Sequence, residues 1–340
     1  MGKSYFYLNR RQFLSVCSSS VMALMITSCN SLQSLVQGTR TPLPPETSAG
    51  WEKYKNNPVL GGDLGVCFDV ALLHEGDIYR MWFSWRPKQS IALVESPDGI
   101  RWGKPVIVLG PNPASHWEDD VNRPIVLKKD GGYQMWYTGH VENGKSCIGY
   151  AVSPDGVSWQ RKSDGPVLSP ELEWEGSAAM CPDVMYDQKN QIYRMWYSAG
   201  GGYEPNAIGY ATSSDGIKWQ KLPTNPVFAP DPGNDWEKDR VTASQIIPYQ
   251  DWFYMFYIGF RNINNAQIGA ARSRDGISNW ERHKNNPLIL QGVQGEWDKD
   301  SAYKPFAILD GQRWWLWYNG RNGLVEQIGL AIHEGIDLGF

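Results

Sequence analysis

A repeat of about sixty residues constrains the fold of this chain more than any other feature. One series of segments joins an Asp-Gly pair to a following tryptophan, and it reads SPDGIRW at 96–102, SPDGVSW at 153–159, SSDGIKW at 213–219 and SRDGISNW at 273–280. A second series keeps step with the first and reads RMWFSW, QMWYTG, RMWYSA, YMFYIG and WLWYNG, starting at residues 80, 134, 194, 254 and 315. The chain therefore contains five similar units.

Each unit carries the signals of four short strands. An apolar run is followed by a turn, the MWY-type segment, a variable loop, an IGYA-type segment, the Asp-Gly turn and a last segment ending in NPVL or a relative. Asp-Gly suits a tight turn because glycine tolerates a positive φ and the aspartate accepts hydrogen bonds from nearby amides. Four antiparallel strands joined by hairpins make one blade. The 17 Trp, 17 Tyr and 35 Gly favour the same all-β class. We therefore predict a five-bladed β-propeller.

The fifth unit shows no segment of the NPVL kind after IGLAIHEGIDLGF. A matching segment stands at the other end of the array, because WEKYKNNPVL at 51–60 resembles NWERHKNNPLIL at 279–290. We predict that residues 51–60 complete blade five and close the ring, which removes a free sheet edge. The propeller domain is then expected to span residues 51–340.

The first 29 residues have the features of an export signal. Twin arginines, Arg10 and Arg11, precede a short apolar run, and the segment ITSC ends at Cys29. This pattern resembles the bacterial twin-arginine signal followed by a lipobox, whose cysteine becomes lipidated. We therefore expect an exported bacterial lipoprotein, periplasmic or at the cell surface, held to the membrane only through Cys29. Residues 30–50, rich in Ser, Thr, Pro and Gly, are expected to form a flexible tether.

Charge and cysteine content restrict the partners. The chain has a net charge of −4, and removal of Lys3, Arg10 and Arg11 with the signal leaves −7. Such a surface argues against nucleic acid. Three cysteines, Cys67, Cys147 and Cys181, remain in the domain, an odd number that implies no complete disulfide framework. We expect a monomer with a carbohydrate ligand.

The candidate ligand-binding residues come from two sets of loops that should open on one face of the ring. One set leads into the innermost strand of each blade, and the other joins the second and third strands. Carboxylates, guanidinium groups and amides converging on one concave face suit a polyhydroxylated ligand, for which sugars are the natural choice. The candidates for binding it are Arg86, Arg123, His140, Asp183, Asp239, Arg261, Lys304 and Arg321.

One position of the inner strands varies from blade to blade. Alignment on Pro124, Pro182 and Pro305 places five different residues in this slot: Asp69, Arg123, Cys181, Ser244 and Lys304. A slot with a purely structural role would tend to repeat its residue, so the variation favours a ligand-facing position. By the same reasoning, the Trp-acid pairs that begin at residues 117, 174, 236 and 297 recur in register and indicate an architectural role.

With these motifs, residues 51–340 resemble the five-bladed propeller glycosidases of glycoside hydrolase families 43 and 32. The resemblance implies a blade-one aspartate as base or nucleophile, a blade-two aspartate that tunes it and a blade-three glutamate as general acid. Asp69 matches the first role, and Asp120, with Asp119 as the alternative, is nearest to the second. Family 32 carries ECPD on blade three, where this chain has Met180 in place of the glutamate. The general acid is then expected from Glu175 or Glu204.

Other chemistries fit the sequence poorly. The five histidines are scattered and form no spaced metal pair, and we expect no metal, although the resemblance leaves room for a channel-bound Ca²⁺. Two functional hypotheses stand beside each other. The first is an exported glycoside hydrolase that acts on a poly- or oligosaccharide at the channel mouth. The second is a carbohydrate-binding propeller without catalysis, which Met180 would allow, and an interaction scaffold is a further alternative.

Overall fold

A computed structural model describes residues 46–141, 144–201 and 204–340, all within one compact unit that spans Leu43–Phe340. The predicted signal with Cys29, and residues 30–45 of the predicted tether, lie outside the described residues. The last part of that tether segment packs on the domain. The Glu46 carbonyl accepts a hydrogen bond from Leu290, and the Ser48 N–H donates to Leu288. The folded unit therefore includes residues upstream of Trp51.

The described residues form five sets of four strands. Blade one contains β2 (Cys67–Glu75), β3 (Ile78–Trp85), β4 (Ser90–Ser96) and β5 (Val106–Leu109). Blade two contains β6 (Asp120–Lys129), β7 (Gly132–His140), β8 (Ser146–Ser153) and β9 (Gln160–Arg161). Blade three contains β10 (Ala178–Asp187), β11 (Ile192–Gly200), β12 (Ala207–Ser213) and β13 (Gln220–Lys221). Blade four contains β14 (Arg240–Tyr249), β15 (Trp252–Asn262), β16 (Asn265–Ser273) and β17 (Glu281–Arg282). Blade five contains β18 (Ser301–Asp310), β19 (Arg313–Asn322), β20 (Val325–Glu334) and β1 (Trp51–Lys53).

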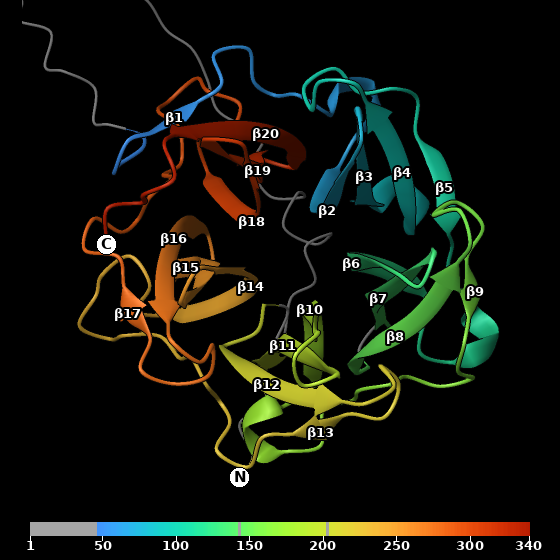
Figure 1. The fold of residues 1–340 in the computed structure, drawn as a ribbon. Helices are drawn as coiled ribbons and strands as arrows, with labels where there is room; N and C mark the ends of the chain where they lie inside the picture. Colours follow the sequence, from blue (N-terminus) through green and yellow to red (C-terminus); the bar gives the residue numbers. More distant parts are fainter. Residues whose placement is uncertain (1–45, 142–143, 202–203) are drawn as a thin grey trace, which may run out of the picture. The chain divides into compact units, whose positions relative to one another are not determined.

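Four short 3-10 helices lie in the connections: η1 (Gly62–Leu64), η2 (Arg86–Lys88), η3 (Pro113–Ser115) and η4 (Glu173–Glu175). Within each blade the strands pair antiparallel, and one parallel pair, Ser146 with Ala178, joins the sheets of blades two and three. The inner strands β2, β6, β10, β14 and β18 contact one another in this order, and β18 contacts β2. Figure 1 shows the sheets of this unit arranged around a central axis. The predicted all-β propeller of four-stranded antiparallel sheets is confirmed.

The N-terminal segment closes the ring as predicted. Strand β1 pairs with β20, with Trp51 opposite His333. The side chain of Asn57 continues this pairing, since its amide bonds both the N–H and the carbonyl of Leu330. Trp51 is buried and packs edge-on against Phe256 of blade four. Residues 51–60 therefore supply the outer strand that the fifth unit lacks.

The Asp-Gly turns are structural hairpins that also join neighbouring blades. In blade two, the Asp155 carboxylate accepts hydrogen bonds from the N–H groups of Val157 and Ser158. The carbonyl of Gly156 accepts a hydrogen bond from the indole of Trp82 in blade one. The same indole-to-glycine bond links Trp136 to Gly216, Trp196 to Gly276 and Trp317 to Gly99. In blades one, two, three and five, the tryptophan of the MWY-type segment thus ties its blade to the next one.

Candidate active site

Each inner strand contains one residue that interrupts the regular pairing. The register of β2, β6, β10, β14 and β18 shifts at one point, and a non-glycine residue with a φ between 47° and 56° lies there: Asp69, Arg123, Cys181, Ala243 and Lys304. This left-handed conformation costs roughly 1–2 kcal/mol for a residue with a side chain. Strain of this kind is concentrated where a fold must aim particular side chains. We call these five residues the central ring.

The sequence alignment placed Ser244 in this ring, and that assignment is wrong by one position. Ala243 has the left-handed φ, and Ser244 occupies the place held by Pro124, Pro182 and Pro305 in other blades. The alignment failed because blade four has no proline after its ring residue. Four of the five predicted members are correctly placed, and the blade-four member contributes no functional group.

Backbone hydrogen bonds between blades hold the ring in this conformation. The amide of Arg123 donates to Ser84 Oγ at 2.8 Å, and that of Cys181 donates to Thr138 Oγ1 at 3.1 Å. The equivalent amides of Ala243 and Asp69 donate to Ser198 and Asn319. The acceptors are the last polar residues of the MWFS, MWYT, MWYS and LWYN segments. This pattern explains why a short polar residue recurs after the aromatic pair.

The seam between blades four and five differs from the other four. Ile258 occupies the acceptor position beside Lys304, and Phe256 occupies the position of the tryptophan that binds the next Asp-Gly turn. Gln245 forms another bond there, since its side chain bonds both backbone groups of Ala307. Residues 46–53 also span this seam, because Thr47 pairs with Ile289 of blade four before β1 pairs with blade five.

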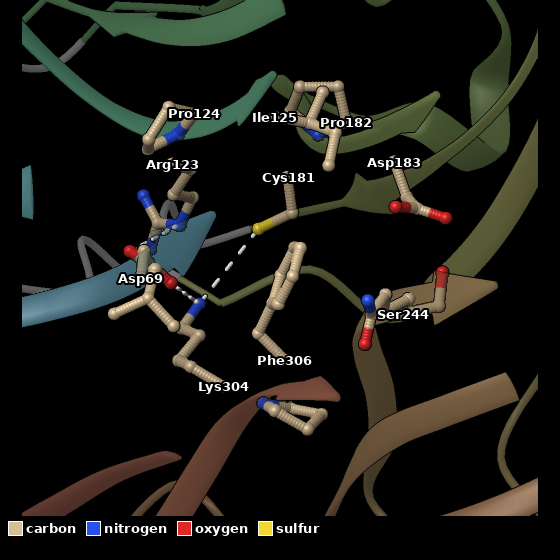
Figure 2. Close-up of a pocket in the computed structure, with 13 residues that line it drawn as sticks. Asp69, Arg123, Pro124, Ile125, Cys181, Pro182, Asp183, Ser244, Lys304 and Phe306 are labelled. Carbon is tan, nitrogen blue, oxygen red and sulfur yellow. Dashed lines mark hydrogen bonds and ion pairs between the residues drawn. The ribbon is translucent and has the colours of Figure 1, made fainter. Parts of the chain in front are cut away.

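Four charged side chains meet at the centre of the ring. Asp69 Oδ2 lies 3.6 Å from Arg123 Nε, and Asp69 Oδ1 lies 3.5 Å from Lys304 Nζ. Glu204, from the hairpin between β11 and β12, lies 3.6 Å from Lys304 Nζ and 4.0 Å from Arg123 Nη2. All four are buried. Figure 2 shows Asp69, Arg123, Lys304 and Cys181 converging from separate strands.

The two central carboxylates are close enough to act on one glycosidic bond. Asp69 Oδ1 and Glu204 Oε2 both contact the Lys304 ammonium, so they lie at most about 7.1 Å apart, the sum of 3.5 and 3.6 Å. Paired carboxylates of glycosidases lie about 5–5.5 Å apart in retaining enzymes and about 6.5–9.5 Å apart in inverting ones. Among the predicted acids, Glu204 is the one that the structure brings to Asp69.

A second polar group borders the ring on blade two. Burial raises the pKa of Asp120, while the positive charges of Arg86 and Arg123 oppose this rise. Asn122 donates a hydrogen bond to Asp120 Oδ1, and its own carbonyl accepts one from Arg123 Nη1 at 3.2 Å. His140 Nε2 lies 2.9 Å from the same Arg123 nitrogen. Asp120, Arg86, Arg123 and His140 therefore belong to one site, whereas Asp119 is exposed.

Asp183 lies below the ring and has an interblade contact of its own. Its Oδ2 accepts a hydrogen bond of 2.7 Å from the N–H of Ile246 in blade four. Burial raises its pKa to about 7, although this hydrogen bond favours the ionised form. In Figure 2, Phe306 lies between Asp183 and the charged group. Asp183 lines the same pocket as Asp69, Arg123 and Lys304, on the far side of Phe306 from Asp69.

Glu175 has a structural environment that is repeated in other blades. Burial opposes its ionisation, but hydrogen bonds from the amides of Glu171 and Leu172 and from Lys221 outweigh burial and lower its pKa. It also accepts a hydrogen bond from Tyr197. The acids at the same step of the Trp-acid motif, Glu118, Glu237 and Asp298, each bind the strand-two tyrosine and a basic residue of their blade's outer strand. The pKa shift is opposite to what a general acid requires, and the structure does not bring Glu175 to Asp69.

The remaining predicted binding residues lie in blades four and five, with Asp239 just before β14 and Arg261 and Arg321 near the ends of β15 and β19. Asp239 pairs with Arg240, which also bonds the backbone carbonyl of Glu204. Arg261 pairs with Asp235, and both side chains are more than half exposed. Arg321 bonds the carbonyl of Asn264. These residues surround the mouth of the channel and have no contact with Asp69 among the described interactions.

Sequence reasoning missed two residues of the site. Asn122 and Ser146 both contact His140, and neither belongs to a repeated motif. A signal was present in the sequence, because Asn122, His140 and Ser146 are positions at which blade two departs from the repeat. Met180, which stands where family 32 has its acid, is buried in a small apolar cluster with Ala178 and Cys181.

Within the ranges that the structure describes, no three His, Cys, Asp or Glu side chains come together as a group able to hold a metal ion. In the same ranges, no helix has the length and apolar character needed to cross a bilayer.

Known proteins resemble the chain at the level of family and fold. An uncharacterised protein of Mycobacterium tuberculosis is 28% identical over 215 residues, covering 58% of this chain and 68% of that protein. The 1,2-beta-oligomannan phosphorylase of Thermoanaerobacter sp. is 32% identical over 139 residues, covering 37% and 44%. A thermostable family-43 glycoside hydrolase aligns with a TM-score of 0.65 at 17% identity, over 79% of this chain and 90% of that one. Residues 55–334 match the profile of glycosyl hydrolases family 43, and the chain therefore belongs to that family.

Proposed function

We propose that this protein cleaves glycosidic bonds of a poly- or oligosaccharide at the mouth of the propeller channel. The observation that carries the proposal is the contact of Asp69 and Glu204 with one ammonium group, Lys304 Nζ, which keeps the two carboxylates at a spacing suited to such a bond. Membership of glycosyl hydrolase family 43 supports it. A binding propeller without catalysis has no need for paired buried carboxylates.

The proposed roles follow from the surroundings of each carboxyl group. Asp69, between Arg123 and Lys304, acts as the base or nucleophile. Glu204 acts as the general acid. It lies on the hairpin between β11 and β12 and supplies the proton that Met180 cannot donate. Asp120 adjusts the charge balance around Arg123. An acid must deliver its proton to the leaving oxygen, so its loss is felt most when the leaving group is a poor one.

A second candidate is phosphorolysis, in which inorganic phosphate replaces water. The observation that favours it is the environment of Lys304, whose side chain is 3% exposed. Its ammonium lies 3.5 Å from Asp69 Oδ1, 3.6 Å from Glu204 Oε2 and 3.9 Å from Cys181 Sγ, so a phosphate oxygen would meet a buried cation beside the paired carboxylates. A phosphate oxygen would form the bond to the anomeric carbon, and the glycosidic oxygen would leave with a proton from the acid. The similarity to an oligomannan phosphorylase supports this candidate.

The test is cleavage by the purified protein of aryl glycosides and oligomannosides, each with and without inorganic phosphate. We expect cleavage in phosphate-free buffer for hydrolysis, and glycosyl phosphate formed only with phosphate for phosphorolysis. Glu204→Gln should lose about 10²–10⁴-fold on poor leaving groups and much less on activated ones. If Asp120→Asn showed this leaving-group dependence and Glu204→Gln kept the wild-type rate, Asp120 would be the general acid and Glu204 the residue that adjusts the charge balance. Binding of glycans without any turnover would contradict the proposal.

We also propose that the protein is exported and anchored through a lipid on Cys29. The twin arginines and the ITSC segment support this proposal. Cys29→Ala should move the protein from the membrane fraction to the soluble fraction and abolish incorporation of a labelled fatty acid. Cys17→Ala, in the same segment, is the matched control and should change neither. Recovery of the wild-type protein from the soluble fraction without lipid would contradict the proposal.

A further inference from the structure

The strand register of blade two brings three polar side chains into one row. His140, the last residue of β7, lies opposite Asp120 of β6 on one side and opposite Ser146 of β8 on the other. His140 Nδ1 lies 2.7 Å from Ser146 Oγ, and its Nε2 lies 2.9 Å from Arg123 Nη1. The imidazole therefore bridges a hairpin and the central ring.

The chemistry of arginine decides which nitrogen of His140 holds the proton. Nε2 has two neighbours with opposite demands, because Arg123 Nη1 at 2.9 Å can only donate a hydrogen bond and Asn122 Oδ1 at 3.0 Å can only accept one. The shorter, charge-assisted contact with Arg123 favours a lone pair on Nε2. Nδ1 then carries the proton and donates it to Ser146 Oγ. Asn122 Oδ1 accepts a hydrogen bond of 3.2 Å from Arg123 Nη1, so it keeps a donor in this arrangement.

The charges around His140 keep the imidazole neutral. Burial holds its pKa well below the usual range, and the positive charges of Arg123, Arg86 and Lys304 act in the same direction. Asp120 is the carboxyl group opposite it in the sheet. A neutral acceptor suits the site because it orients Arg123 without neutralising it, and this leaves the positive charge for Asp69 and Glu204.

We infer that His140, fixed as its Nδ1–H tautomer by Ser146, is a positioning residue that aims Arg123 at the paired carboxylates. Arg123 is then held at both ends, because Ser84 fixes its strained backbone and His140 fixes its guanidinium. His140 does not touch the substrate in this role, unlike in the sequence-based prediction. Its effect on turnover rests on the proposed function, whereas its tautomer does not.

The first test is therefore spectroscopic and needs no substrate. In the full chain labelled with ¹⁵N-histidine, the resonances of His140 are identified by their disappearance in His140→Phe. We expect a neutral imidazole with the proton on Nδ1 near pH 6, and a mixture of tautomers in Ser146→Ala. An imidazolium at that pH, or a proton on Nε2 bonded to Asn122, would overturn the inference even if the enzyme is active.

The second test is kinetic and uses the aryl glycoside that the wild-type protein cleaves best. His140→Phe should lower kcat about 10–100-fold with a small change in KM, as loss of an orienting partner does. His140→Gln keeps an acceptor oxygen and should recover most of the rate. His74→Phe, at a histidine on a distant hairpin that stacks on Tyr79, is the control. A rise in KM alone would show that His140 contacts the substrate. An equal loss of kcat in the Phe and Gln variants would show a general packing role. Either result would contradict the inference.

Discussion

Replacement of Asp69 by asparagine should lower glycoside cleavage by at least about 10³-fold and leave the fold intact. The carboxylate is the group that contacts both Arg123 and Lys304, and an amide can serve neither as nucleophile nor as base. Asparagine is the matched replacement because it tolerates the left-handed conformation, and Asp69 has a φ of 51°. The measurement is kcat/KM on the best aryl glycoside, with thermal unfolding as the check on folding.

The exposed Asp119→Asn is the control for this experiment. It makes the same chemical change at the neighbouring candidate of blade two and should retain the wild-type rate. Because Asp69 is buried beside two cations, loss of its charge leaves Arg123 and Lys304 less well compensated, and a moderate fall in stability is expected as well. Retention of more than a tenth of the activity in folded Asp69→Asn protein would remove Asp69 from the mechanism.

Truncation of Trp51 to alanine should destabilise the whole domain by about 3–5 kcal/mol. The side chain is 2% exposed and packs against Phe256 of blade four and His333 of blade five, so its loss opens a cavity at the seam that closes the ring. Lys53, two residues further, pairs at 2.8 Å with the buried Asp298, and this pair also depends on β1 staying in place. The measurement is the free energy of unfolding in urea.

Trp280→Ala tests whether the closing seam is special. Trp280 occupies the same step of the repeat in blade four, as the match of residues 279–290 to 51–60 shows, but it is partly exposed and its strand does not close the ring. We expect a smaller loss of stability there. Equal losses at the two positions would mean that ring closure adds nothing beyond ordinary packing.

The sequence predicted the fold well because the fold is repeated. Each blade repeats the same signals, and the match of residues 51–60 to residues 279–290 predicted the closing strand. The site was harder to predict, because function lies in the departures from the repeat. Alignment on prolines found Arg123 and Lys304 but chose Ser244 over Ala243, since a one-residue bulge leaves no mark in a strand without proline.

The acids show the same limit. Glu175 and Glu204 were both candidates for the general acid, although the recurrence of the Trp174-Glu175 pair in register already indicated an architectural role. The hydrogen bonds of Glu175 to Tyr197 and Lys221 identify it as part of the architecture. Ser146 and Asn122 were missed because their role depends on which residues face each other across three strands. Strand register is a property of the folded sheet, and the sequence of a single segment does not predict it.

The segment from Glu46 to Lys53 has a mechanical consequence. It pairs first with blade four and then with blade five, across the seam where Ile258 and Phe256 replace the polar groups that bind neighbouring blades elsewhere. A pull on the chain upstream of Glu46 is therefore delivered to these hydrogen bonds before any other part of the domain. Strand β1, which closes the ring, is therefore also the element that bears such a force.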